Sequence, residues 1–151
     1  MAKKSTESIP KVNKVDTIIL RLRQLRKTLD YEILICRKEI EIKEIKMSKY
    51  KSSRNGRFIA AKVEKERFEL ALQSYLDAKK DLYEGFKTIL KKYKHPECDL
   101  ITDCVIDEIP VNELMEKYNK TYKETMEILA NFSHSIVGRF RYAFQSQYFD
   151  L

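Results

Sequence analysis

The chain has 151 residues and a formal net charge of +7; 43% of its residues are hydrophobic and 35% are charged. Lys, Glu, Ile and Leu dominate, and only three glycines and three prolines occur. This composition predicts a small all-helical protein of few, long elements and argues against a sandwich or a barrel. No apolar run reaches the roughly 18 residues of a membrane-spanning helix, and three cysteines are too few for a disulfide framework. We therefore expect a cytoplasmic protein without a membrane partner.

Charge changes sign along the chain. Residues 1–95 include 25 basic and 13 acidic side chains, whereas residues 96–151 include 5 basic and 10 acidic ones. This division favours two surfaces that meet different partners, although a solvated helix exterior could carry the same charges without binding anything. Residues 1–13 contain Lys, Ser, Thr and Pro without an apolar period, which predicts a flexible basic arm.

The segment 14–94 predicts a long antiparallel helical hairpin with coiled-coil character. In its first helix, apolar residues recur in steps of three and four along one face: Val15, Ile18, Leu22, Leu25, Leu29, Ile33, Cys36 and Ile40. A second apolar stripe lies roughly 200° around the same helix. It consists of Tyr31, Ile35, Ile42 and Ile45. Because two opposite apolar faces need two covers, we expect this second stripe to be the interface of a homo-oligomer.

The second helix of the hairpin follows the turn sequence Ser-Ser-Arg-Asn-Gly at 52–56, where Asn-Gly tolerates a positive φ. Its seam alternates steps of three and four residues: Phe58, Ala61, Lys65, Phe68, Leu72, Tyr75, Lys79, Leu82, Phe86, Ile89 and Tyr93. His95-Pro96 ends this helix, because a residue before proline is pushed out of the α region. Residues 95–151 predict a bundle of short helices at about 97–106, 111–118, 122–130 and 134–148.

The sequence contains no motif that would support catalysis. It has no nucleophile elbow, Walker loop or zinc-protease motif, and its carboxylates alternate with Lys and Arg at the spacing of surface ion pairs. His95, Cys98 and Cys104 are spaced H-x2-C-x5-C without a fourth ligand nearby, which favours buried thiols over a zinc site. We expect no enzymatic activity, no metal and no cofactor.

The turn of the hairpin is the most basic part of the sequence. Residues 46–62, which we call the hairpin tip, contain no acidic residue and six cations: Lys46, Lys49, Lys51, Arg54, Arg57 and Lys62. Such a concentrated positive field, with Tyr50 and Phe58 inside it, can bind phosphates by releasing counterions. The same charges could instead only keep a helical tip soluble. A second basic patch near the start of the first helix consists of Arg21, Arg23, Arg26 and Lys27.

The C-terminal segment 122–145 has the pattern of a helix-turn-helix. In this interpretation Ile128, Leu129 and Ala130 close the first helix, Asn131 and Phe132 form the turn, and Ser133 caps the second helix. Val137, Phe140 and Phe144 face the core, while Ser135, Arg139 and Arg141 can point elsewhere.

With these residues, the segment 97–147 resembles the region-four helix-turn-helix of sigma factors. It is similar above all to phage late-gene regulators of the ArpU and RinA type, in which such a unit follows a helical N-terminal part. The resemblance implies recognition of duplex DNA by the second helix.

Two functional hypotheses follow. The first is a DNA-binding transcriptional regulator of phage type that oligomerises through its hairpin. Here His134, Ser135 and Arg139 contact base edges, while Arg141 and the cations of the hairpin tip hold phosphates. The alternative is an interaction protein, either an inhibitor or adaptor of a host nucleic-acid enzyme or a packaging or assembly factor. Its basic face would occupy the acidic groove of a protein partner.

Overall fold

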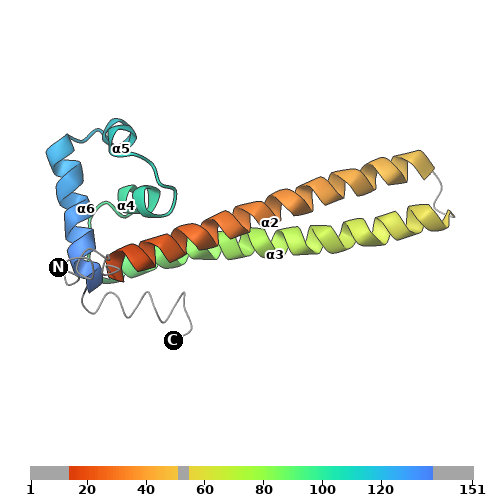
Figure 1. Cartoon of the computed structure of the whole chain (residues 1–151), viewed down its shortest axis with the longest axis horizontal. Coiled ribbons are helices and arrows are strands. Elements are labelled where there is room, and N and C mark those ends of the chain that lie inside the picture. The colour runs from red at the N-terminus through yellow and green to blue at the C-terminus, as the bar shows by residue number, and fades with distance from the viewer. Residues whose placement is uncertain (1–13, 51–54, 138–151) are drawn as a thin grey trace, which may run out of the picture. The chain divides into compact units, whose positions relative to one another are not determined.

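The computed structural model of the chain describes residues 14–50 and 55–137, and the predicted arm at 1–13 lies outside this part. The described residues form helices and no strand, which confirms the predicted all-helical fold. The helices are α2 (Lys14–Tyr50), α3 (Gly56–Lys92), α4 (Cys98–Val105), α5 (Val111–Tyr118) and α6 (Tyr122–Val137) (Figure 1). Within this part, no helix is both long and apolar enough to cross a membrane.

The chain divides into two compact units, which are described separately. The hairpin unit is Leu25–Leu82, and the bundle unit combines Met1–Gln24 with Tyr83–Leu151. The first turns of α2 and the last turns of α3 therefore belong with the short helices. Leu22, Phe86 and Leu90 are fully buried in this bundle unit.

The hairpin unit consists of α2 and α3 packed side by side in opposite directions (Figure 1). The predicted seam is confirmed on α2, where Leu29, Ile33 and Cys36 are buried. Two ion pairs fix the antiparallel register. The Asp30 carboxylate accepts a hydrogen bond of 2.5 Å from Lys79 Nζ, and Lys43 Nζ lies 2.7 Å from a Glu64 oxygen. Asp30, in the first half of α2, thus pairs with Lys79, in the second half of α3. Lys43, in the second half of α2, pairs with Glu64, in the first half of α3.

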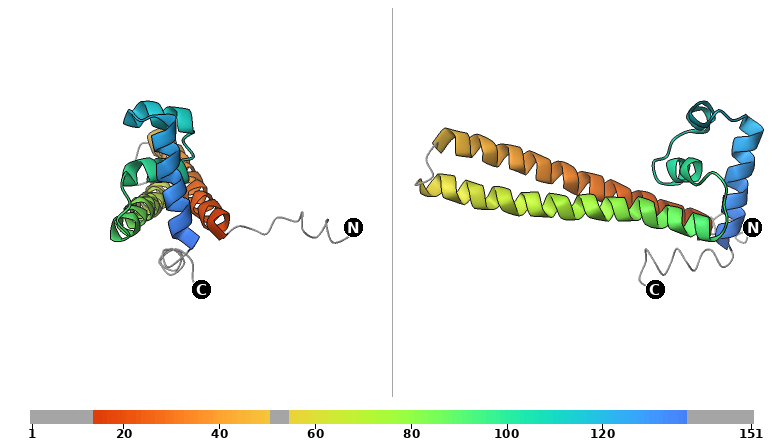
Figure 2. Two further views of the ribbon diagram at one scale, coloured as in Figure 1. Left: turned by 90° about the vertical axis from the view of Figure 1, so that its left-hand side faces the viewer. Right: turned by 180° about the vertical axis from the view of Figure 1, so that it is seen from behind.

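The bundle unit is built around Phe132 of α6. Its ring makes edge-to-face contacts with Phe86 at 5.9 Å and with His95 at 6.0 Å between ring centroids. Helices α4, α5 and α6 each contact the other two. Figure 2 shows these short helices from two further sides. Their buried side chains include Leu100, Ile101, Ile106 and Leu114.

One predicted boundary is wrong. The sequence predicted a turn at Asn131 and Phe132 with Ser133 as the cap of a new helix, but α6 runs without a break from Tyr122 to Val137. The physical reason is that Phe132 continues the buried face begun by Thr125, seven residues and two helical turns earlier. The remainder of the predicted helix 134–148 lies outside the described residues.

We expect Phe132→Ala to lower the free energy of unfolding by about 3–5 kcal/mol, because it empties the space between Phe86 and His95. Met126→Ala, on an exposed part of the same helix, should change it by less than about 0.5 kcal/mol. Urea denaturation of both variants followed by circular dichroism measures the difference. Equal effects would contradict the continuous α6.

Candidate nucleic-acid interface

The connection between α5 and α6 is a short, tightly bonded turn. Asn119 ends α5 in the left-handed conformation, with φ 52° and ψ 54°. The backbone N–H of Lys120 then donates to the Met115 carbonyl oxygen at 3.0 Å, which is the closing bond of a Schellman motif. Helix α5 therefore ends at a single left-handed residue.

The start of α6 is fixed by a capping box. The Thr121 hydroxyl accepts a hydrogen bond from the backbone N–H of Glu124, and the Glu124 carboxylate accepts one from the backbone N–H of Thr121, both at 3.1 Å. The hydrogen bond from the Thr121 backbone N–H to the carboxylate lowers the pKa of Glu124. Three residues, 119–121, thus separate two helices in contact, and a connection of this length is found in helix-turn-helix units. The sequence analysis predicted the turn between two helices at Asn131 and Phe132, one helix later than the turn at 119–121.

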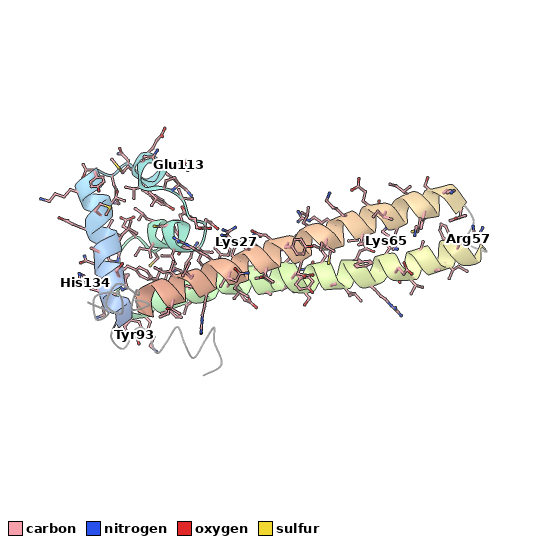
Figure 3. All side chains as sticks on the ribbon, viewed as in Figure 1. Lys27, Arg57, Lys65, Tyr93, Glu113 and His134 are labelled. Carbon is pink, nitrogen blue, oxygen red and sulfur yellow. The ribbon has the colours of Figure 1, made fainter. Side chains whose placement is uncertain are left out.

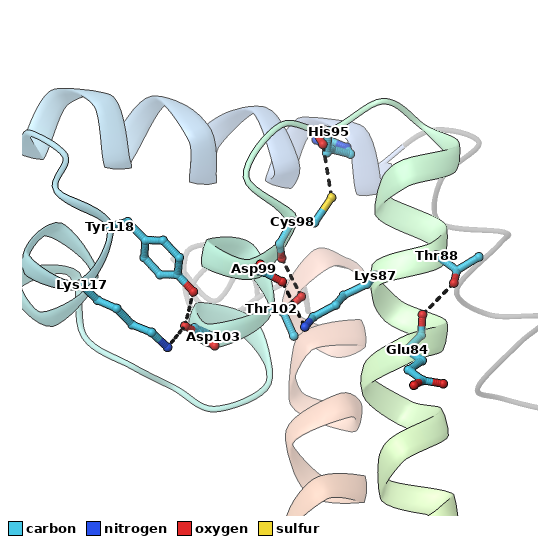
Figure 4. A network of polar contacts seen from close by, with 10 residues as sticks. All are labelled: Glu84, Lys87, Thr88, His95, Cys98, Asp99, Thr102, Asp103, Lys117 and Tyr118. Atoms are coloured by element: carbon cyan, nitrogen blue, oxygen red, sulfur yellow. Dashed lines mark hydrogen bonds and ion pairs between the residues drawn. The ribbon is translucent and has the colours of Figure 1, made fainter.

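Helix α4 holds the turn in place from the side. Asp103 accepts hydrogen bonds from Lys117 Nζ at 2.6 Å and from the Tyr118 hydroxyl at 2.5 Å, as Figure 4 shows. Burial, followed by the bond to Asp103, raises the pKa of Tyr118. Lys120, in the turn itself, lies 3.1 Å from the carboxylate of Glu97. The end of α5 and the turn after it are therefore anchored at two points.

Side chains of the predicted basic patch near the start of α2 form hydrogen bonds within the protein. In the bundle unit, Arg23 Nε donates to the Val105 carbonyl at 2.8 Å and its Nη2 to the Cys104 carbonyl at 3.1 Å. In the hairpin unit, Arg26 Nη1 donates to Asp30 at 3.1 Å. Two of the four predicted cations thus support the fold.

The outer face of α6 carries a continuous row of exposed residues. Lys123, Glu127, Ala130 and His134 follow one another at steps of four, three and four residues, on the side opposite to Thr125 and Phe132. His134, a predicted DNA contact, thus lies in this row. Figure 3 labels this residue on α6. The side chain of Ser135 and all of Arg139 and Arg141 lie outside the described residues.

At the hairpin tip, Lys46, Lys49 and Arg57 are exposed around the half-buried Tyr50. Arg57 Nη1 donates to the Tyr50 hydroxyl at 3.3 Å, and its guanidinium carbon lies 5.5 Å from the centre of the Tyr50 ring. This hydrogen bond lowers the pKa of Tyr50. Lys51 and Arg54 lie outside the described residues.

A hollow of about 210 Å³ opens at this tip, lined by Lys46, Tyr50, Arg57, Ala60, Ala61 and Glu64. The one carboxylate in the lining, Glu64, is paired with Lys43 at 2.7 Å, and this hydrogen bond lowers the pKa of Glu64. Lys46 and Arg57 also line the hollow, and its one carboxylate is already paired with Lys43. The arrangement suits an anionic group such as a phosphate.

The cysteines are free thiols whose pKa values are raised by burial. Cys98 Sγ donates to the His95 carbonyl oxygen at 3.3 Å. In the part of the chain that the structure describes, no group of three or more His, Cys, Asp and Glu side chains is placed to hold a metal ion.

In comparisons with known proteins, no family model, curated protein or solved structure matches this chain.

Two substitutions at Asn119 test the turn. Asn119→Gly should leave the free energy of unfolding unchanged or raise it by up to about 1 kcal/mol, since glycine adopts a left-handed conformation without strain. Asn119→Val should lower it by about 1–3 kcal/mol. The same pair at Asn112, which is exposed on α5, should give the opposite order, because glycine weakens a helix. Thermal unfolding of the four variants measures the order, and the same order at both positions would contradict the turn.

Proposed function

We propose that the protein is a DNA-binding transcriptional regulator of phage type, whose helix α6 enters the major groove. The observation that carries this proposal is the arrangement of α5, the capped turn at 119–121 and α6. In a helix-turn-helix the second helix reads base edges, mainly with residues near its N-terminus. The candidate reading helix is thus α6 itself, which begins twelve residues before the predicted second helix at 134.

The exposed row of α6 supplies the chemistry for reading bases. A lysine such as Lys123 donates to guanine O6 and N7 or to a phosphate, and a glutamate such as Glu127 accepts from the cytosine amino group. Ala130, which lies between Glu127 and His134 in the row, has a small side chain and therefore lets the helix approach the groove closely. With 16 residues, α6 is about 24 Å long, which is enough to follow the groove across several base pairs.

Two features of the hairpin unit support the rest of the proposal. Lys46, Lys49 and Arg57 at the tip can hold phosphates without reading sequence. Three of the four residues in the predicted oligomer stripe are solvent-exposed: Tyr31 by 61%, Ile42 by 44% and Ile45 by 64%. The fourth, Ile35, is half-buried. Apolar side chains this exposed in one row favour self-association, which would give the regulator two or more reading helices.

Sequence reading is tested on α6. The full-length protein first selects its preferred duplex from a random library, and binding is then measured by fluorescence anisotropy. Lys123→Ala and Glu127→Ala should each weaken binding to that duplex by about 1–3 kcal/mol, with little effect on a scrambled one. Glu113→Ala, exposed on α5, is the matched control and should change neither.

The absence of binding to any duplex or single strand at about 50 mM salt would reject the regulator. Stable co-purification with a host protein, together with that absence, would favour the interaction-protein hypothesis instead.

The phosphate contacts of the tip are tested by salt. Each cation that holds a phosphate adds roughly one unit to the slope of log affinity against log salt concentration. Replacing Lys46, Lys49 and Arg57 together by Ser should therefore weaken binding to all duplexes alike and flatten that slope. Replacing the exposed cations Arg37, Arg67 and Lys91 by Ser removes the same charge elsewhere. If both triple variants lower the slope equally, the tip has no special role.

A further inference from the structure

The hairpin unit exposes an apolar stripe on each of its two helices. On α2 the stripe contains Leu34 and Ile45, exposed by 50% and 64%, besides Tyr31 and Ile42. On α3 it contains Ile59, Val63 and Leu70, exposed by 47%, 44% and 75%. Each stripe lies on the side of its helix opposite to the seam. The stripe on α3 was not predicted, because the sequence alone does not distinguish exposed apolar residues from those of the core.

The charges within the two stripes are opposite. The stripe on α2 includes Lys27 and Lys38, which are exposed. The stripe on α3 includes Glu66 and Asp77, also exposed, with Asp77 accepting a hydrogen bond from Gln73 at 2.9 Å. Cations also occur beside the α3 stripe, at Lys62 and Lys80, but they lie at its border. The centre of one stripe is therefore apolar and basic, and that of the other is apolar and acidic.

The two stripes also match in spacing. Along α2, Lys27, Leu34, Lys38 and Ile45 follow at intervals of seven, four and seven residues. Read backwards along α3, Asp77, Leu70, Glu66 and Ile59 follow at the same intervals. An antiparallel alignment of the two stripes therefore places Lys27 by Asp77, Leu34 by Leu70, Lys38 by Glu66 and Ile45 by Ile59.

We propose that the α2 stripe of one chain packs antiparallel on the α3 stripe of a second copy of this chain. Pairing of α2 with α2 of a second copy would bring Lys38 near Lys38 or Lys27, and pairing of α3 with α3 would bring Glu66 near Asp77. Both self-pairings juxtapose like charges, whereas the mixed pairing joins opposite ones. This inference rests on the self-association in the proposed function, and it is independent of whether DNA is bound.

Such an interface is heterologous, because the two surfaces in contact differ. Each copy then keeps one unused stripe on either side, so assembly continues until it closes into a ring or forms an open array. Because α2 and the neighbouring α3 run antiparallel, as they do within one hairpin, all tips point the same way. The Lys46 and Arg57 side chains of successive copies then lie along one rim, where they can follow a polyanion.

The test uses two variants of the full chain. Leu34→Gln with Ile45→Gln disables the α2 stripe, and Ile59→Gln with Leu70→Gln disables the α3 stripe, because glutamine removes the apolar contact without adding a charge that could pair across the interface. Neither variant should oligomerise alone at micromolar concentration, whereas an equal mixture should form a dimer and stop there, since its two outer stripes are disabled. Light scattering after size exclusion and native mass spectrometry measure the mass. Circular dichroism checks that both variants keep their helices, and Arg37→Glu with Arg67→Glu, outside both stripes, should assemble as wild type does.

A second pair of variants tests the charges. Lys38→Glu should weaken assembly at least about tenfold, and Glu66→Lys added to the same chain should restore it. A variant that still oligomerises with its α3 stripe disabled, or a mixture that forms no dimer, would overturn the mixed pairing while leaving self-association intact. A wild-type chain that is monomeric at these concentrations would reject both the mixed pairing and self-association, whether or not the chain binds DNA.

Discussion

The burial of Phe132 is the contact on which the arrangement of the bundle unit depends. Its ring fills the space between Phe86, near the end of α3, and His95, in the connection that follows. An aromatic side chain buried this completely stabilises a fold by several kcal/mol, more than most other single contacts. Because Phe132 and Thr125 must both face inward, the rotation of α6 about its own axis is fixed. The outward face of α6 is a consequence of that constraint.

Hydrogen bonds and ion pairs then define the first turn of α6 and the position of the end of α5, which apolar burial alone does not determine. Burial alone would allow α6 to begin a residue earlier or later, but the reciprocal bonds between Thr121 and Glu124 define its first turn. The Asp103 carboxylate, bonded to Lys117 and Tyr118, holds the end of α5 against α4. In the proposed function, this turn would hold the reading residues of α6 in place, since a reading residue displaced by an ångström loses its hydrogen bonds.

The hairpin unit follows a different physical logic. A pair of helices has one shared seam, so any other apolar residue on either helix remains exposed within a single chain. The ion pairs of Asp30 with Lys79 and of Lys43 with Glu64 set the register of the seam. Burial alone would raise the pKa of Asp30, but the hydrogen bonds from Lys79 and Arg26 outweigh it and lower that pKa. The outer stripes therefore have a defined position even in the isolated chain.

The sequence by itself determined the two long helices, their antiparallel pairing and the starts of α4 and α5. A heptad period of this length is compatible only with a helix, and Pro96 and Pro110 interrupt helices through local sterics. Thr121 and Glu124 also have the spacing of a capping box, so the sequence contained the signal for the true turn. Only the tertiary structure decided that α6 continues through Asn131 and Phe132, because a phenylalanine fits a turn or a helix until a buried partner such as Phe86 is placed beside it. The same holds for the stripe of Ile59 and Leu70, since an apolar side chain is core or surface only according to what packs against it.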